Sequence, residues 1–347
     1  MEQDEKTAEK FSSRCLQPAV ETYIRLSLVP EVVDEMMSGN DSVDFSTRMF
    51  FQYSVLKDLL SKDKFCLFIE YTSSYEKFIR GWIQEKIEEH FSDGTKLLEL
   101  EDKYLKQCIR CIEYGIQKAH VNKEATQKEF VQDICKELGN KLVMSQDALS
   151  TCMALLKEAT AEKFANSLKK SVKEMEKALQ KKQKETGFKA KLDGLGSKVL
   201  NNLTVKLGGC GEKCPFCSAP CEAGAVAHKV HRVEIHRPEG LGGYRSASMK
   251  LITSICTSSV STDMRFSNRD TKGLWHPYKE FKTFYKNWEI SADKSYTTSD
   301  YWKYVMVKFN EDFAEFYDAE PANIPTEWRT ISKEDADKSL KEAFGVI

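Results

Sequence analysis

The sequence predicts a mainly α-helical protein with a multi-helix N-terminal domain followed by a helix-rich C-terminal domain. Apolar residues recur at helical spacing through the first half of the chain, where Pro18 and Pro30 are the only prolines before residue 150. Glycines then become frequent between residues 187 and 209, which indicates a looser connection. We therefore expect a helical domain over residues 1–204 and a second domain over residues 205–347.

Two segments of the N-terminal domain show the clearest helical stripes. Residues 76–91 place apolar side chains on one face at spacings of about four residues, namely Phe78, Ile79, Trp82, Ile83 and Ile87. Residues 49–60 are similarly apolar, with Phe50, Phe51, Val55, Leu56 and Leu59. We expect each segment to form a helix that buries one face.

A longer amphipathic helix is expected near residues 154–185. Its apolar residues alternate between spacings of four and three, the pattern of a short coiled-coil seam: Ala161, Ala165, Leu168, Val172, Met175 and Leu179. We favour packing of this face within its own domain. Pairing with another chain, including self-association, is the alternative.

The same helix carries a local excess of positive charge. Residues 169–191 contain nine lysines against three glutamates. Such a face is usually solvated, and the alternative is an electrostatic surface for nucleic acid or anionic lipid. Phe188 is the only aromatic residue among the lysines, so a platform for stacked bases is not predicted.

Three helices are expected in the C-terminal domain. One spans about residues 246–258, with Leu251, Ile252 and Ile255 facing inward. A second begins near Asp300, which we expect at the N-cap. A third follows Ser332-Lys333-Glu334-Asp335, which fits a capping box.

Composition limits the classes of protein to consider. The 347 residues are 41% hydrophobic and 30% charged, with a net charge of −1, so no overall field directs the chain toward nucleic acid or membranes. No apolar run reaches the roughly 18 residues of a membrane span, and the charged N-terminus lacks a signal-peptide core. Eleven cysteines in such a chain indicate reduced thiols and metal ligands. We expect a cytoplasmic location, with the nucleus as a further compartment.

The strongest chemical signal is a cluster of cysteines and histidines. Four of the eleven cysteines and three of the six histidines lie within it: Cys210, Cys214, Cys217, Cys221, His228, His231 and His236. The spacing C-x2-C-x13-H-x4-H, with a tight reversal at Cys214-Pro215-Phe216-Cys217, is typical of zinc sites. We predict one zinc ion bound by Cys214, Cys217, His231 and His236, with Cys221 as the alternative ligand.

The expected role of this zinc is structural. Four protein ligands leave no open position for water, so the ion would stabilise the C-terminal domain rather than act in catalysis. Cys210 and His228 are weaker candidate ligands, and a second ion that shares a ligand is an alternative. Reduced thiols without metal and a redox pair are further alternatives. Pro220 favours a loop after the cysteines instead of the helix that a DNA-reading zinc finger requires.

Several motifs of the C-terminal half are distinctive in combination. They are Cys214-Pro215-Phe216-Cys217, Cys221, His231, His236-Arg237-Pro238, Ile255-Cys256-Thr257-Ser258, Phe266-Ser267-Asn268, Trp275-His276-Pro277-Tyr278-Lys279 and Ser299-Asp300-Tyr301-Trp302-Lys303-Tyr304. Together they resemble the carboxy-terminal region of the interferon-induced very large GTPase family. The resemblance continues upstream in Gln52-Tyr53-Ser54-Val55-Leu56-Lys57-Asp58-Leu59-Leu60 and so covers most of the chain.

What the resemblance implies about function is limited. Members of the family carry a guanine-nucleotide-binding domain, whereas this sequence contains no Gly-x4-Gly-Lys-Ser/Thr phosphate loop, so no GTPase activity is expected. The resemblance implies a helical and zinc-bearing tail and an intracellular role linked to interferon and innate immunity.

The favoured function is therefore that of a non-catalytic interaction or scaffold protein with a structural zinc site and protein partners. A zinc-dependent ubiquitin ligase is the enzymatic alternative. Nucleic-acid or lipid binding through the lysine-rich face of residues 169–191 is the other, with nucleic acid the less expected partner.

Overall fold

The computed structural model describes residues 2–39, 43–122, 124–139, 141–195, 197–223, 228–293 and 296–346. Sixteen α-helices and four two-residue strands occur in these ranges, which confirms the mainly α fold class. The chain forms two compact units: unit 1 contains residues 1–35 and 87–199, and unit 2 contains residues 36–86 and 200–347. Residues 36–86 were expected in the N-terminal domain, and they lie in the same unit as the Cys/His cluster.

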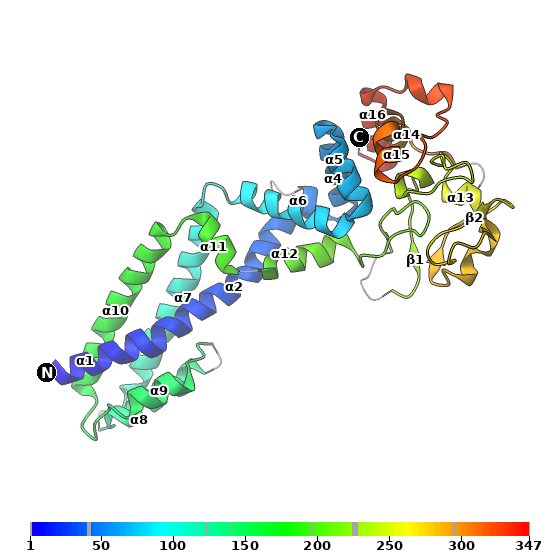
Figure 1. The fold of residues 1–347 in the computed structure, drawn as a ribbon. Coiled ribbons are helices and arrows are strands. Elements are labelled where there is room, and N and C mark those ends of the chain that lie inside the picture. The colour runs from blue at the N-terminus through cyan, green and yellow to red at the C-terminus, as the bar shows by residue number, and fades with distance from the viewer. Residues whose placement is uncertain are drawn as a thin grey trace. The chain divides into compact units, whose positions relative to one another are not determined.

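Unit 1 is built from helices alone in the part of the chain that the structure describes (Figure 1). They are α1 (Glu2–Phe11), the π-helix η1 (Ser12–Leu16), most of α2 (Gln17–Ser38), the end of α6 (Tyr75–His90), α7 (Thr95–Ala119), α8 (Gln127–Leu138), α9 (Gln146–Met153), α10 (Glu162–Glu185), α11 (Phe188–Leu195) and the start of α12 (Ser197–Leu203).

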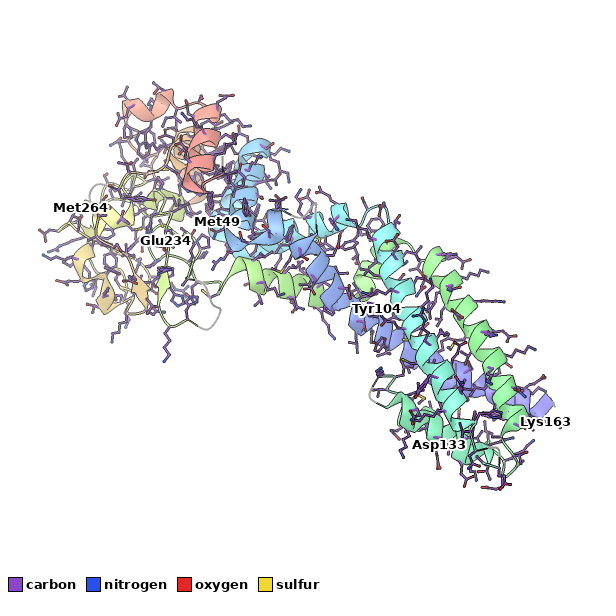
Figure 2. All side chains as sticks on the ribbon, turned by 180° about the vertical axis from the view of Figure 1, so that it is seen from behind. Met49, Tyr104, Asp133, Lys163, Glu234 and Met264 are labelled. Carbon is purple, nitrogen blue, oxygen red and sulfur yellow. The ribbon has the colours of Figure 1, made fainter. Side chains whose placement is uncertain are left out.

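The long amphipathic helix predicted near residues 154–185 is α10. Helices α1 and α7 pack against it. All six seam residues are buried within the chain, namely Ala161, Ala165, Leu168, Val172, Met175 and Leu179. The lysines lie on the other faces, and Lys163 marks the first turn of the helix in Figure 2. The seam is therefore covered by unit 1 itself.

Local capping explains where several helices of unit 1 begin. Gly94 adopts a positive φ of 70° before α7, and the carboxylate of Asp93 accepts a hydrogen bond from the amide of Thr95 at 2.9 Å. At the start of α8, Thr126 and Glu129 form a reciprocal capping box. These contacts satisfy amides that have no partner within the helix.

Unit 2 combines short helices with an irregular, closely packed region. Its elements are the end of α2, α3 (Val43–Ser46), α4 (Arg48–Lys62), α5 (Phe65–Ser73), most of α6, the end of α12, the π-helix η2 (Thr204–Gly208), β1 (His231–Arg232), the 3-10 helix η3 (Glu239–Gly242), α13 (Cys256–Ser259), β2 (Arg265–Phe266), β3 (His276–Pro277), the 3-10 helix η4 (Tyr278–Thr283), β4 (Trp288–Glu289), α14 (Asp300–Lys308), α15 (Asn310–Phe316), the 3-10 helix η5 (Thr326–Thr330) and α16 (Lys333–Ala343). Strands β1 and β4 pair in parallel, and β2 and β3 pair antiparallel.

The helix predicted at residues 246–258 is wrong. Only α13 is helical there, because residues 246–249 form a turn and Lys250, Leu251 and Ile255 pair with other segments of the chain. Leu251 donates to the carbonyl of Glu320, and Ile255 pairs antiparallel with Pro238. Met249 also has a positive φ of 66°, which a right-handed helix excludes.

The two other predicted C-terminal helices are present. Ser299, not Asp300, occupies the N-cap of α14, and Asp300 is the first helical residue. The capping box between Ser332 and Asp335 begins α16. Helices α14 and α16 pack on each other, and α16 also packs on α4, so residues far apart in sequence share one core. No helix in the described ranges is long and apolar enough to cross a lipid bilayer.

Candidate metal centre

Eight cysteine and histidine side chains of unit 2 gather in two groups of four. We call the first the buried group, which consists of Cys214, Cys217, His236 and Cys256. We call the second the outer group, which consists of Cys210, Cys221, His228 and His231. Within each group, the sulfur and ring-nitrogen atoms that would bind a metal lie within 4.8 Å of one another.

A tight reversal brings the first two sulfurs of the buried group together. The amide of Cys214 donates to the carbonyl of Ala219 at 2.8 Å, and the amide of Ser218 donates back to the carbonyl of Cys214 at 2.9 Å. Ser218 adopts a positive φ of 56° within this turn. The Cys-x-x-Cys spacing thus forms a closed knuckle, as the sequence indicated.

The other two members arrive from more distant parts of the chain. The antiparallel pairing of Pro238 with Ile255 places His236, just before one partner, beside Cys256, just after the other. The Nδ1 atom of His236 lies 3.4 Å from the sulfur of Cys217 and 2.8 Å from that of Cys256. The sulfurs of Cys214 and Cys256 are 3.7 Å apart.

These separations fit a single tetrahedral ion. Zinc bonds of about 2.3 Å to sulfur and about 2.0 Å to nitrogen would separate two sulfurs by about 3.8 Å, and a sulfur from a nitrogen by about 3.6 Å. Two of the three measured distances agree closely, and the contact between Cys256 and His236 is shorter than such an edge. All four side chains are at most 3% exposed, so the group is shielded from bulk water.

The electrostatics of the buried group also suit a cation. Burial raises the pKa of the Cys214 and Cys256 thiols well above the ordinary value. Burial acts in the same direction on Cys217, but hydrogen bonds from Cys214 and Cys256 and the charge of His236 lower the pKa of Cys217 well below its ordinary value. Burial lowers the pKa of His236, but the charge of Cys217 outweighs this effect and raises it. One thiolate is thus already favoured, and a bound cation would stabilise the others.

Arg237 joins the knuckle to the helices of unit 2. Its Nε donates to the carbonyl of Cys217 at 2.7 Å and its Nη2 to that of Ser218 at 2.6 Å. The guanidinium also lies over the rings of Tyr71 on α5 and Trp302 on α14, at 5.6 Å and 5.1 Å from their centroids. The side chain is only 1% exposed, so a positive charge is buried next to the group of thiols.

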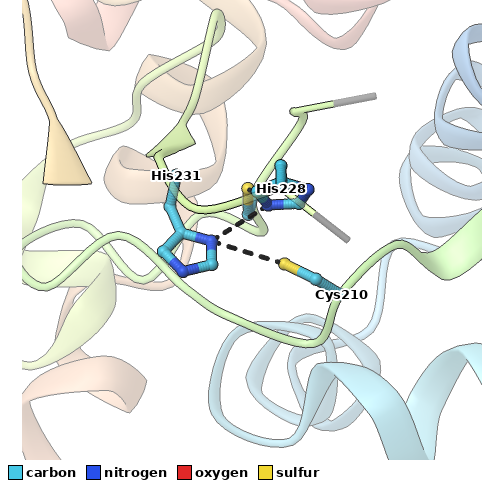
Figure 3. A group of neighbouring side chains, drawn as sticks. Cys210, His228 and His231 are labelled. Carbon is cyan, nitrogen blue, oxygen red and sulfur yellow. Dashed lines mark hydrogen bonds between the residues drawn. The ribbon is translucent and has the colours of Figure 1, made fainter. Parts of the chain in front are cut away.

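The outer group lies closer to solvent. Cys221 and His231 are buried, whereas Cys210 and His228 are half-buried. Figure 3 shows Cys210 and His228 approaching the same ring nitrogen of His231: its Nδ1 is 3.6 Å from the sulfur of Cys210 and 3.1 Å from Nε2 of His228. That Nε2 atom lies 3.4 Å from the sulfur of Cys221.

The structure divides the predicted ligands between the two groups. Cys214, Cys217 and His236 come together, while His231 and the alternative ligand Cys221 belong to the outer group with Cys210 and His228. Sequence reasoning missed Cys256, which lies 42 residues after Cys214. Its signal was the motif Ile255-Cys256-Thr257-Ser258, which contributed to the family resemblance but was not considered as a source of ligands.

The fold and the two groups of side chains place this chain in a class of mainly helical proteins that have a Cys/His-rich, closely packed C-terminal region. Residues 210–340 match the family model described as interferon-induced very large GTPase 1, C-terminal domain. Over 340 residues the chain is 25% identical to human interferon-induced very large GTPase 1, and over 341 residues it is 24% identical to the mouse protein. Each match covers 94% of this chain and 14% of the relative, so the chain spans about a seventh of its relatives' length.

The resemblance to the carboxy-terminal region of this family, predicted from the motifs, is thereby confirmed. All eight residues of the two groups lie within the matched range. No solved structure matches the chain.

Proposed function

We propose that residues 210–340 form a zinc-stabilised, non-catalytic interaction module. The observation that carries this proposal is the convergence of four buried ligand residues, with their ligand atoms within 4.8 Å of one another: Cys214, Cys217, His236 and Cys256. Three thiolates and one imidazole form a soft ligand set that suits zinc. Because all four positions are filled by protein, no position is left for a reacting water, and the ion serves folding.

Charge balance supports the same assignment. Zinc with three thiolates and a neutral imidazole carries a net charge of −1, and the buried guanidinium of Arg237 contacts the backbone of the same knuckle. A buried cation is costly unless opposite charge or hydrogen bonds compensate it. The zinc–thiolate centre and Arg237 therefore stabilise each other.

The metal is tested by elemental mass spectrometry of the purified chain. We expect Cys256→Ser to lose one zinc per chain relative to the unsubstituted protein. Cys66→Ser is the matched control, since Cys66 is an exposed cysteine of α5 outside both groups. Equal zinc content in the two variants would exclude a metal at the buried group.

The proposed role is the binding of protein partners inside the cell, in the cytoplasm or nucleus, within an interferon-linked immune response. Support comes from the resemblance to the interferon-induced family and from the closed ligand set. The Cys66→Ser chain should capture partner proteins from interferon-treated cells in an affinity experiment. The Cys256→Ser chain should fail to capture the same proteins. A chain that is monomeric in light scattering and recovers no more than an unrelated control protein would contradict the proposal.

A zinc-dependent ubiquitin ligase is the second candidate, because one compact unit holds two groups of four cysteine and histidine residues that could each bind a metal. Some ligase modules use zinc to present a binding surface to a conjugating enzyme. The candidate predicts self-ubiquitination in the presence of activating enzyme, ubiquitin and a panel of conjugating enzymes. Absence of product with zinc-replete protein across the panel would eliminate it.

A further inference from the structure

We propose that the outer group binds a second metal ion of the zinc class, and that this ion exchanges more readily than the one in the buried group. The site consists of Cys210, Cys221, His228 and His231 and shares no residue with the buried group. The inference does not depend on the zinc proposed above, because each set of four is complete without the other.

Three separations within the outer group match those expected around a zinc ion held by two sulfurs and two nitrogens. Around zinc, a sulfur and a nitrogen would lie about 3.6 Å apart, and two nitrogens about 3.3 Å apart. The sulfur–nitrogen distances are 3.6 Å for Cys210 with His231 and 3.4 Å for Cys221 with His228. The two ring nitrogens of His228 and His231 are 3.1 Å apart.

Hydrogen bonding alone accounts poorly for this arrangement. Nδ1 of His231 faces both a thiol and another ring nitrogen, and a neutral imidazole nitrogen either donates one proton or accepts. A catalytic thiol–imidazole pair would use two of the four groups and give no reason for the other two to converge. A central cation satisfies all four lone pairs together.

The backbone around the outer group is held in place by residues outside it. Arg48, at the start of α4, donates through its guanidinium to the carbonyl of Cys221 and, at 3.2 Å, to that of Ala223. Gly209 makes room for this guanidinium, since a Cβ there would lie 2.3 Å from Nη2 of Arg48. The parallel pairing of His231 with Trp288 fixes the other side, with the two rings 5.3 Å apart.

The difference in burial sets the order in which the ions leave. All members of the buried group are at most 3% exposed, whereas two members of the outer group are half-buried. A chelator removes an ion only if the ion is accessible to solvent or if a protein ligand first dissociates. Half-buried ligands can dissociate without unfolding of the core. The outer ion should therefore be released first, and the buried ion only with loss of structure.

Native mass spectrometry of the full chain with zinc as the only added metal tests the assignment. We expect two zinc ions in the unsubstituted protein and one in His228→Gln. His276→Gln is the control, since His276 is a half-buried histidine of the same unit outside both groups, and it should retain two. The unsubstituted protein could instead bind one zinc, which is lost in Cys256→Ser and kept in His228→Gln. That result would overturn the second site and leave the proposed function standing. The reverse pattern would support the second site and overturn the buried one.

Two measurements keep the test independent of how well a variant folds. Titration of the unsubstituted chain with a chelator should release one zinc per chain before the second, and a single step with one ion would overturn the proposal. Cobalt(II) in place of zinc reports thiolate ligands by charge-transfer absorption. Removal of the first ion should abolish the weaker charge-transfer absorption, which comes from the two thiolates of the outer group. If the stronger absorption from the three thiolates of the buried group disappears first, the assigned order is wrong.

Discussion

At the scale of single residues, Arg237 connects the metal-binding knuckle to the aromatic core of unit 2. It donates to two carbonyl oxygens of the knuckle and lies over two aromatic rings, with 1% of its surface exposed. We predict that Arg237→Met destabilises unit 2 by about 3 kcal/mol, because the buried carbonyl of Cys217 and the part-buried carbonyl of Ser218 lose their donor. Urea unfolding monitored by tryptophan fluorescence measures the change in the free energy of unfolding.

Arg245→Met provides the comparison for this prediction. Arg245 also donates to two backbone carbonyls, those of Tyr317 and Asp318, but it is exposed, so water can replace its hydrogen bonds. We expect a loss below about 1 kcal/mol there. Equal losses of unfolding free energy in the two variants would show that the burial of Arg237 does not determine its contribution to stability.

Gly242 shows how closely the chain packs on the knuckle. A Cβ at this position would lie 2.8 Å from the carbonyl oxygen of Phe216 and 3.1 Å from the carbonyl carbon of Cys217. We predict that Gly242→Ala costs about 1–3 kcal/mol of unit 2 stability, because backbone must move to admit the methyl group. Differential scanning calorimetry would detect this as a lower melting temperature.

Gly81→Ala is the matched substitution for Gly242→Ala. Gly81 lies within α6, and a Cβ there meets nothing within 4 Å. Alanine is favoured over glycine inside a helix by roughly 0.5–1 kcal/mol, so the melting temperature should rise. A fall of similar size in both variants would contradict the steric explanation.

At the scale of elements, the capping box of α16 is a direct test of a feature predicted from sequence. The Ser332 side chain accepts from the amide of Asp335 at 3.1 Å, and the Asp335 carboxylate accepts from the amide of Ser332 at 2.9 Å. We predict that Ser332→Ala costs about 1 kcal/mol and speeds hydrogen exchange in the first turn of α16. Unchanged exchange in that turn would contradict the prediction.

The same cap should give a small dependence on pH. The hydrogen bond from the backbone of Ser332, followed by that from its side chain, lowers the pKa of Asp335 below the ordinary 3.8. The carboxylate therefore stabilises the folded state above that value, and the contribution disappears as the pH falls through the folded-state pKa. Asp335→Asn should be less stable than the unsubstituted chain at pH 7, and the difference should shrink in acid.

The lysine-rich helix α10 shows how an element can carry two patterns with different roles. Its apolar seam is buried within unit 1. On its lysine side, Lys182 pairs with Glu21 at 2.9 Å. Beyond the end of α10, Lys191 on α11 pairs with Glu101 at 2.5 Å, and its side chain is only 7% exposed. Acidic residues within the protein thus neutralise part of the positive excess of residues 169–191.

At the scale of the whole molecule, the two units should respond differently to metal removal. The two Cys/His groups lie entirely in unit 2, whereas unit 1 has a core of helix-packing residues. We predict that a strong chelator abolishes amide protection in unit 2 and leaves the protection of α7 and α10 largely intact. Hydrogen exchange with mass spectrometry measures both units in one experiment, and simultaneous loss in both would contradict the prediction.

Features that depend on neighbours in sequence could be predicted from the sequence. The stripe of α10, the capping box at Ser332 and the reversal between Cys214 and Cys217 each involve residues within a few positions or one helix face. Their physics is local, since helix periodicity, capping and turn closure need no knowledge of distant chain. The helix expected at residues 246–258 failed because pairing with distant segments outweighed its local apolar pattern.

The sequence by itself therefore determined the mainly helical class, the family resemblance and the presence of a soft-ligand cluster. Only the tertiary structure decided how the ligands are grouped. Pairing of Pro238 with Ile255 brings Cys256 to His236, and pairing of His231 with Trp288 holds His231 among the outer ligands. The spacing of ligands along a chain leaves their grouping open, because which of them meet in space is set by long-range backbone pairing.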